Sequence, residues 1–152
     1  NMPLMVMSAD CTPILLYDPI RHVCGAVHAG RTGALGEILP KTIQAMEQQF
    51  GSLRKNLQII LGPSIHSCCY EINETIAYET VSKGYTSALY RRDKRVFLDV
   101  NTILLEQLKA LSVDTTQIEV IEHCTSCKSG EYFSYRADAQ KTGRIAGVII
   151  LR

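Results

Sequence analysis

The sequence lacks an excess of charge of either sign and lacks a long apolar run. Its 16 Lys and Arg residues against 15 Asp and Glu leave a formal net charge of +1, so no basic surface indicates a nucleic-acid partner. No apolar run approaches the roughly 20 residues of a membrane-spanning helix, and no signal-peptide pattern precedes the first expected strand. We therefore expect a cytoplasmic protein without nucleic-acid or membrane partners.

Internal repeats, low-complexity segments and linkers are absent from the sequence as well. A length of 152 residues corresponds to one domain, with a core large enough to fold without disulfides. The 46% of apolar and 20% of charged residues are ordinary for a globular protein. We expect a single domain over residues 1–152, as a monomer or a homodimer.

Histidine is scarce, and its spacing argues against one class of metal enzyme. The chain has four histidines, His22, His28, His66 and His123, and none forms a His-x-His pair. A multicopper oxidase needs many histidines, with such pairs at its trinuclear cluster. Copper-dependent oxidation is therefore poorly supported by the residues themselves.

Apolar strand patterns alternate with helical patterns along the chain. Several of these strands are apolar on both faces, which is typical of a sheet covered by helices. The sequence therefore predicts an α/β fold with a mixed sheet covered by helices. Loops are expected over residues 30–33 and 87–94, and residues 132–135 are strand-like. Expected strands are 2–7, 14–17, 23–27, 57–61, 96–98, 118–121 and 145–151, and expected helices are 35–50, 73–83 and 100–111.

Two candidate metal ligands follow the expected strands near the N-terminus. Asp18-Pro19 predicts a turn between neighbouring strands, which would bring Cys11 and His28 to the same end of the sheet. A thiolate and an imidazole are ligands that zinc prefers. Without further information, a histidine at this position is more often a hydrogen-bonded core residue. Asp10, beside Cys11, is either a turn former or a residue that orients a metal ligand.

The six cysteines include a second pattern, Cys124-Thr-Ser-Cys127. Such a pair can be a redox centre or half of a zinc site, but a redox pair usually opens a helix and here a loop pattern follows. A four-cysteine site with Cys68 and Cys69 would require adjacent residues to bind one metal, which is an awkward geometry. We expect free thiols in loops.

Four groups of residues, in this order and spacing, together resemble the laccase-domain, or polyphenol oxidase, family, which is associated with purine nucleoside phosphorylase activity. Each segment is a weak signal alone, but the ordered set is specific and extends over nearly the whole chain. The segments are Ser-Ala-Asp-Cys-Thr-Pro (8–13), Val-His-Ala-Gly (27–30), Leu-Gly-Pro-Ser-Ile-His-Ser-Cys-Cys-Tyr-Glu-Ile (61–72), and Cys-Thr (124–125) with Phe-Ser-Tyr-Arg (133–136) and Gly-Arg (143–144).

The resemblance implies a mononuclear zinc site with one cysteine and two histidines as ligands. It assigns Cys11 and His28 to the metal and to catalysis. The family carries its other histidine in a segment before the Ala-Asp-Cys motif, and that segment is not in this chain. We expect that the chain is N-terminally truncated; the alternative is that His22, His66 or His123 is the third ligand.

The resemblance also implies the reaction. A phosphorylase converts adenosine, inosine or methylthioadenosine and phosphate into the base and a sugar 1-phosphate, and an adenosine deaminase activity is implied beside it. Phosphate binding favours arginine, so Arg31, Arg136 and Arg144 are candidate substrate-binding residues. Relatives usually have Trp-Arg-Gly after His-Ala-Gly, whereas this chain has Arg31-Thr32-Gly33. The displaced arginine puts its role in doubt.

Two other functions stay open on the sequence alone. The first is a non-catalytic metal- or thiol-binding domain, which an incomplete zinc site would favour. The second is a copper-dependent phenol oxidase, with copper less expected than zinc. Tight stoichiometric zinc favours the purine nucleoside phosphorylase, whereas copper retained through dialysis favours the oxidase.

Overall fold

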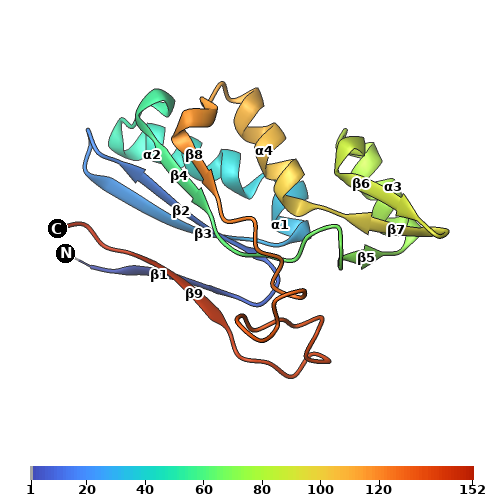
Figure 1. Ribbon diagram of the computed structural model, residues 1–152. Helices are drawn as coiled ribbons and strands as arrows, with labels where there is room; N and C mark the ends of the chain where they lie inside the picture. Colours follow the sequence, from blue (N-terminus) through green and yellow to red (C-terminus); the bar gives the residue numbers. More distant parts are fainter. Residues whose placement is uncertain (1) are drawn as a thin grey trace.

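A mixed four-stranded sheet forms the centre of the computed structural model, which describes residues 2–152 (Figure 1). Strand β2 (Thr12–Asp18) pairs antiparallel with β3 (Val23–Ala29) on one side and with β4 (Gln58–Leu61) on the other. Strand β8 (Ile118–Val120) completes the order β3-β2-β4-β8 and runs parallel to β4. The predicted mixed sheet is confirmed.

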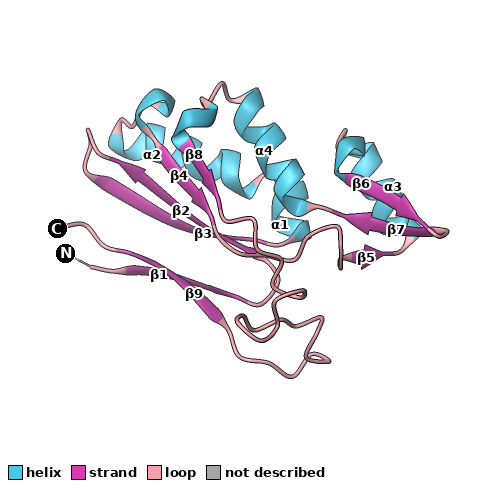
Figure 2. Ribbon diagram, viewed as in Figure 1, coloured by secondary structure: helices cyan, strands magenta, loops and turns pink. Residues whose placement is uncertain are grey.

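Helices cover one face of this sheet, as the apolar strands require. Helices α1 (Arg31–Leu35), α2 (Ile38–Phe50) and α4 (Val100–Ala110) lie on the same side (Figure 2). The short helical turns Arg54–Asn56, Thr86–Ala88 and Thr115–Gln117 lie in the connections. The core between sheet and helices is built from fully buried aliphatic side chains, among them Ile14, Leu16, Ile59, Leu39, Ile43, Leu104 and Leu108.

The first and last strands form a separate two-stranded ribbon. Strand β1 (Leu4–Ser8) pairs antiparallel with β9 (Ile145–Ile149), and the ribbon lies on the side of the central sheet away from the helices (Figure 1). The chain reaches β9 through a long irregular segment after β8. Pairing of β9 with β1 therefore brings the segment between β8 and β9 back to the region where β1 ends.

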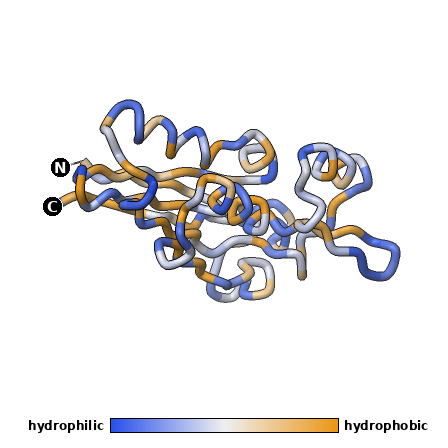
Figure 3. Tube along the Cα trace, turned by 90° about the horizontal axis from the view of Figure 1, so that it is seen from above, coloured by the Kyte–Doolittle hydropathy of each residue, from blue (hydrophilic) through white to orange (hydrophobic). Residues whose placement is uncertain are grey.

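A third, three-stranded sheet extends the molecule beyond α1 and α4, at the right of the view in Figure 1. Strand β7 (Arg95–Leu98) lies between β5 (Glu71–Ile72) and β6 (Leu89–Arg92), and helix α3 (Glu74–Ser82) packs beside them. Hydrophobic strands run through the middle of the molecule, while the β6–β7 turn is a hydrophilic tip (Figure 3).

Several expected boundaries are confirmed, and three local expectations are wrong. Asn73 accepts the Ile76 N–H and Asp99 accepts the Thr102 N–H, so both cap helices as expected. Residues 30–33 open helix α1 instead of forming a loop, residues 87–94 contain strand β6, and residues 132–135 are irregular. Tertiary pairing decides the second case, because polar β6 residues are held by the β7 ladder.

None of the helices within residues 2–152 is both long enough and apolar enough to cross a membrane.

Candidate active site

The β2–β3 hairpin brings Cys11 and His28 to one end of the central sheet, as the sequence predicts. At its tip, the Asp18 carboxylate accepts the N–H groups of Ile20 and Arg21, which fixes the turn. The ladder then pairs Thr12 with Ala29 and Pro13 with His28. One position further along, Cys11 faces the chain at Gly30.

The two candidate ligand atoms converge on Gly30. A Cβ atom built on Gly30 would stand 2.7 Å from Cys11 Sγ and 3.9 Å from His28 Nε2. His28 Nδ1 lies 2.9 Å from the carbonyl oxygen of Met7. That carbonyl can only accept, so Nδ1 carries the hydrogen, and in the neutral imidazole this leaves the lone pair on Nε2. A sulfur and an oriented imidazole nitrogen on one side of a glycine fit a metal ion as two of its ligands.

Burial controls the chemistry of the Cys11 thiol. It raises the pKa of Cys11 above its ordinary value, and the neighbouring Asp10 charge raises it further, whereas Arg144 opposes the shift. The thiol is therefore protonated at neutral pH in the absence of a metal. Metal binding at this position would release the proton.

Asp10 anchors a distant loop, a role that the sequence did not indicate. Its buried carboxylate accepts the hydroxyl groups of Thr125 and Ser134 at 2.7 Å each, and the backbone N–H of Arg136 at 2.7 Å. Three donors satisfy the charge without any contact to His28. Asp10 thus fixes the irregular segment after β8 against the end of β1.

A cavity of about 150 Å³ opens beside Cys11. An adjoining hollow of about 560 Å³ shares three of its residues, Arg31, Tyr70 and Arg136. The two spaces together reach the size of ordinary ligand sites. The smaller cavity is lined by Ala9, Asp10, Cys11, Gly30, Arg31, Ile65, Tyr70, Val100, Tyr135 and Arg136.

Two of the three candidate arginines reach this cavity. Arg31 lines it and forms an ion pair with Glu79 of α3 at 2.7 Å. Arg136 also lines it; its guanidinium donates to the backbone carbonyls of Cys69 and Glu71 and lies 5.4 Å from the centre of the Tyr70 ring.

Arg144 does not line the cavity. It donates to the carbonyls of Thr142 and Gly143, although its charge acts on Cys11. Phosphate binding by Arg144 therefore has less support in the geometry than binding by the other two arginines.

The family described as "Multi-copper polyphenol oxidoreductase laccase" matches residues 1–152. The chain belongs to this family. It is 36% identical over 153 residues to a purine nucleoside phosphorylase of Clostridium acetobutylicum, which covers 99% of this chain and 63% of the relative. It is 35% identical over 151 residues to a purine nucleoside phosphorylase of Streptomyces griseus, covering 99% and 59%.

Solved structures agree with the sequence relatives. The crystal structure of the hypothetical protein YfiH of Bacillus licheniformis superimposes with a TM-score of 0.93 and 29% identity, covering 100% of this chain and 58% of that one. YlmD of Geobacillus stearothermophilus gives 0.87 and 28%, covering 99% and 57%. The chain therefore spans about three-fifths of the length of these relatives.

This laccase-domain chain does not bring a third histidine to Cys11 and His28 within residues 2–152. His22 lies at the far tip of the hairpin, a strand length of about 20 Å away. His123 Nδ1 is engaged at 2.8 Å by the Tyr132 hydroxyl, and among residues 2–152 Cys11 and His28 belong to no group of three side chains placed to hold a metal ion. Of the expected substitutes, none completes the site.

Sequence reasoning missed the aromatic wall of the cavity. Tyr70 lies within the motif at 61–72 but was assigned no role, and its ring lies between Arg31 and Arg136. Burial raises the pKa of Tyr70, with Arg31 opposing, so the hydroxyl is a neutral donor at physiological pH. Only its position between two arginines that are far apart in sequence distinguishes Tyr70 from an ordinary core residue.

The four loop cysteines are free thiols, as expected, but the structure brings them together, which the adjacent positions of Cys68 and Cys69 did not suggest. The sulfur atoms of Cys68, Cys69, Cys124 and Cys127 all lie within 4.8 Å of one another. Within residues 2–152 this is the one group of three or more such side chains placed to hold a metal ion.

Proposed function

We propose that this chain carries zinc- and substrate-binding residues of a purine nucleoside phosphorylase. The observation that supports this is that Cys11, which lies with His28 beside Gly30, lines a cavity that also presents Arg31, Arg136 and Tyr70. The names of the relatives in Clostridium acetobutylicum and Streptomyces griseus support the reaction. The sheet architecture alone does not indicate this reaction, because one fold can support many different functions.

The proposed reaction is phosphorolysis of adenosine, inosine or methylthioadenosine. A phosphate oxygen attacks C1′ of the sugar while the bond from C1′ to the purine nitrogen breaks. The purine leaves with the bonding electrons and takes up a proton, and the sugar 1-phosphate is the second product. Zinc, when bound, would act as a Lewis acid and lower the pKa of its water, which is also the chemistry of the adenosine deaminase activity that we include in the proposal.

Different residues around the cavity would bind the phosphate and the nucleoside. Arg136 and Arg31 present positive charge to phosphate, and arginine can hold two phosphate oxygens at once. Arg136 is held in place by the carbonyls of Cys69 and Glu71, so its orientation is fixed before substrate arrives. Tyr70 offers an aromatic face and a neutral hydroxyl to the nucleoside.

A non-catalytic metal- or thiol-binding domain is the second candidate. The cluster of four cysteines favours it, because that cluster could hold a metal without any substrate nearby. A copper-dependent phenol oxidase is the third, and it rests on the family description. Cys11 and His28 would be its copper ligands here, with no His-x-His pair to build a trinuclear cluster.

The decisive experiment measures metal content and adenosine consumption for the unmodified chain and for Cys11→Ala and His28→Ala. Cys24→Ala is the matched control, since Cys24 lies in the same hairpin as His28 but away from the cavity. We expect one equivalent of zinc to be lost in both variants and retained in the control. Phosphate-dependent release of adenine and ribose 1-phosphate should disappear with it.

Other outcomes separate the candidates. Zinc content unchanged in both variants would show that Cys11 and His28 do not bind the metal. Zinc bound at this site with no phosphate-dependent turnover would favour the non-catalytic domain. Copper retained through dialysis together with phenol oxidation would favour the oxidase, and ammonia release without phosphate would isolate the deaminase part of the proposal.

A further inference from the structure

Two turns that are distant in sequence meet outside the cavity. The first, over residues 66–70, precedes β5, and the second, over residues 124–128, follows β8. They are joined by the isolated bridge between Ser64 and Cys124, where the Thr125 N–H donates to the Ser64 carbonyl at 3.0 Å. Backbone hydrogen bonds by themselves therefore hold the two turns together.

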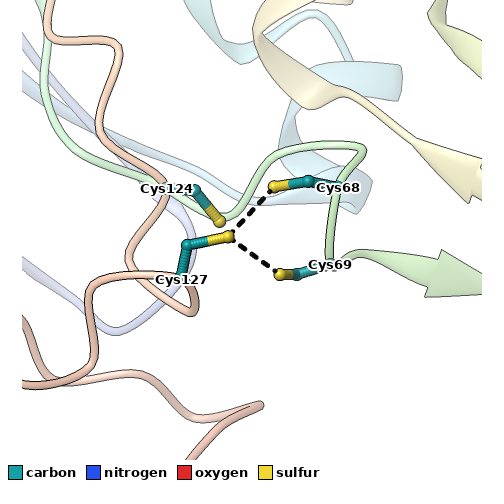
Figure 4. Close-up of side chains that lie close together, drawn as sticks. All are labelled: Cys68, Cys69, Cys124 and Cys127. Atoms are coloured by element: carbon teal, nitrogen blue, oxygen red, sulfur yellow. Dashed lines mark hydrogen bonds between the residues drawn. The ribbon is translucent and has the colours of Figure 1, made fainter.

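Each turn directs two thiols toward the other. In the second turn the Lys128 N–H donates to the Cys124 carbonyl, so one helical turn places Cys124 and Cys127 on the same side. In the first, the N–H groups of Cys69 and Tyr70 both donate to the His66 carbonyl, which tightens the chain at the adjacent cysteines. Figure 4 shows the Cys68 and Cys69 sulfurs both pointing toward Cys127.

The spacing of the sulfur atoms suits one tetrahedral ion. Cys127 Sγ lies 3.5 Å from Cys68 Sγ and 3.3 Å from Cys69 Sγ, and all four sulfurs lie within 4.8 Å of one another. Four thiolates at the usual zinc–sulfur distance of about 2.3 Å would be about 3.8 Å apart. Because of the turn at His66, the adjacent residues Cys68 and Cys69 can both direct their sulfur atoms to one ion.

One arginine, Arg92, lies directly beside the cluster. Four thiolates and one divalent ion would carry a net charge of about −2, which needs compensation. The Arg92 guanidinium donates to the carbonyls of Ser67 and Cys68 at 2.6 and 3.4 Å. Arg92 lines a hollow beside Cys68 and Cys69 together with Arg95, Glu71 and Asp93, and Arg95 is paired with Glu71 at 3.3 Å. Arg92 is therefore the cation that is placed to offset the charge of the cluster.

We propose that Cys68, Cys69, Cys124 and Cys127 bind one structural zinc ion, separate from Cys11 and His28. All four positions of this site are filled by protein sulfur, which is typical of structural zinc and leaves no open position for a substrate. The convergence of four sulfurs favours this over a disulfide, which would join two at about 2.05 Å and leave the other two unused.

The ion would hold the outer wall of the cavity in place. Cys69 directly precedes Tyr70, and its carbonyl accepts from Arg136. Thr125, between the two ligands of the second turn, donates to Asp10. The zinc would thus tie both wall segments to the end of β1 by a strong link that the apolar core does not supply.

The test uses the reduced chain after removal of metal with a chelator. Titration with Co²⁺ should give one equivalent of the intense sulfur-to-cobalt absorption that a tetrahedral thiolate site produces, and Zn²⁺ should displace it. Cys68→Ser and Cys127→Ser should weaken binding by more than the roughly 10–100-fold that loss of an outer-shell partner costs. Cys24→Ser and Cys11→Ser are the controls and should retain the absorption, which also separates this site from the proposed catalytic one.

A second readout needs no variant. Cys68 and Cys127 are exposed, so maleimide at mildly alkaline pH should label both faster in the metal-free chain than once zinc is bound. Peptide mapping identifies the labelled residues. Absorption that persists at full intensity in both serine variants would overturn the proposal. So would equal labelling with and without zinc, or a disulfide within the cluster that forms even in reducing buffer.

Discussion

Cys11 and Gly30 face each other across the open end of the β2–β3 hairpin, so closely that a Cβ on Gly30 would stand 2.7 Å from Cys11 Sγ. Real Cβ atoms do not approach other atoms this closely, so a side chain at this position must displace the thiol. The glycine is needed here for close approach and not for an unusual backbone angle. A metal that uses Cys11 and His28 depends on this space.

Gly30→Ala tests that dependence directly. We expect a loss of zinc affinity of about 10-fold or more, because the sulfur moves relative to His28 Nε2. Gly130→Ala is the matched control, since a Cβ there meets no atom within 4 Å. Zinc titration with a competing chelator measures both. Equal zinc affinity in the two variants would show that the sulfur position is not critical.

Asp10→Asn should release the irregular segment after β8. The amide keeps acceptor capacity on one oxygen only, and its NH₂ group faces donors, so one or more of the bonds from Thr125, Ser134 and Arg136 is lost. We expect the free energy of unfolding to fall by about 3 kcal/mol. Urea denaturation measures this, with the exposed Asp93→Asn as control.

Hydrogen exchange gives the location of that effect. Amide protection in residues 124–142 should fall in Asp10→Asn, whereas protection in the central sheet should be retained. A uniform loss of protection throughout the chain would mean that Asp10 supports the core and not this segment in particular.

Glu79→Gln should make Arg31 more available to an anion. The Arg31–Glu79 ion pair is partly exposed, so its loss should change stability by less than about 1 kcal/mol. Phosphate, however, no longer competes with a carboxylate for the guanidinium. We expect phosphate to bind a few-fold more tightly, measured by calorimetry or as a lower KM for phosphate.

Glu74→Gln is the appropriate comparison for that variant. Glu74 also lies on α3 and pairs with an arginine, Arg91, at 2.7 Å, but that pair is outside the cavity. Its phosphate affinity should equal that of the unmodified chain. If both variants bind phosphate more tightly, the cause is the lower negative charge of the molecule and not Arg31.

Asp18→Asn should remove a pH-dependent part of the stability. Although burial alone would raise the pKa of Asp18, the N–H groups of Arg21 and Ile20, with Ser52, lower it below 3.8 overall. The ionised carboxylate therefore stabilises the folded chain above the unfolded pKa, and this contribution is lost as pH falls through the folded value. We expect the variant to be about 1 kcal/mol less stable at pH 7.

The difference between Asp18→Asn and the unmodified chain should shrink in acid. Both proteins then carry an uncharged group at the hairpin tip. Chemical denaturation across the acid range measures this, with the exposed Glu119→Gln as control. A stability difference that is independent of pH would assign the effect to hairpin geometry and not to charge.

Local patterns in the sequence determined the β2–β3 hairpin and the starts of α3 and α4. Asp18-Pro19 makes the turn, two apolar strands flank it, and the pairing of the strands is enough to bring Cys11 and His28 to one end. Asn73 and Asp99 cap helices because their side chains reach N–H groups within three residues. Such interactions are local, so a single sequence contains them.

Only the tertiary structure decided what meets across long separations. Asp10 receives its donors from residues more than one hundred positions away, and residues 66–69 meet residues 124–127 through the parallel pairing that follows β4 and β8. In the sequence, the adjacent positions of Cys68 and Cys69 are unfavourable for binding one ion. In the structure, the turn at His66 directs both sulfur atoms to Cys127. Strand register and turn geometry, which composition and periodicity do not specify, fix these contacts.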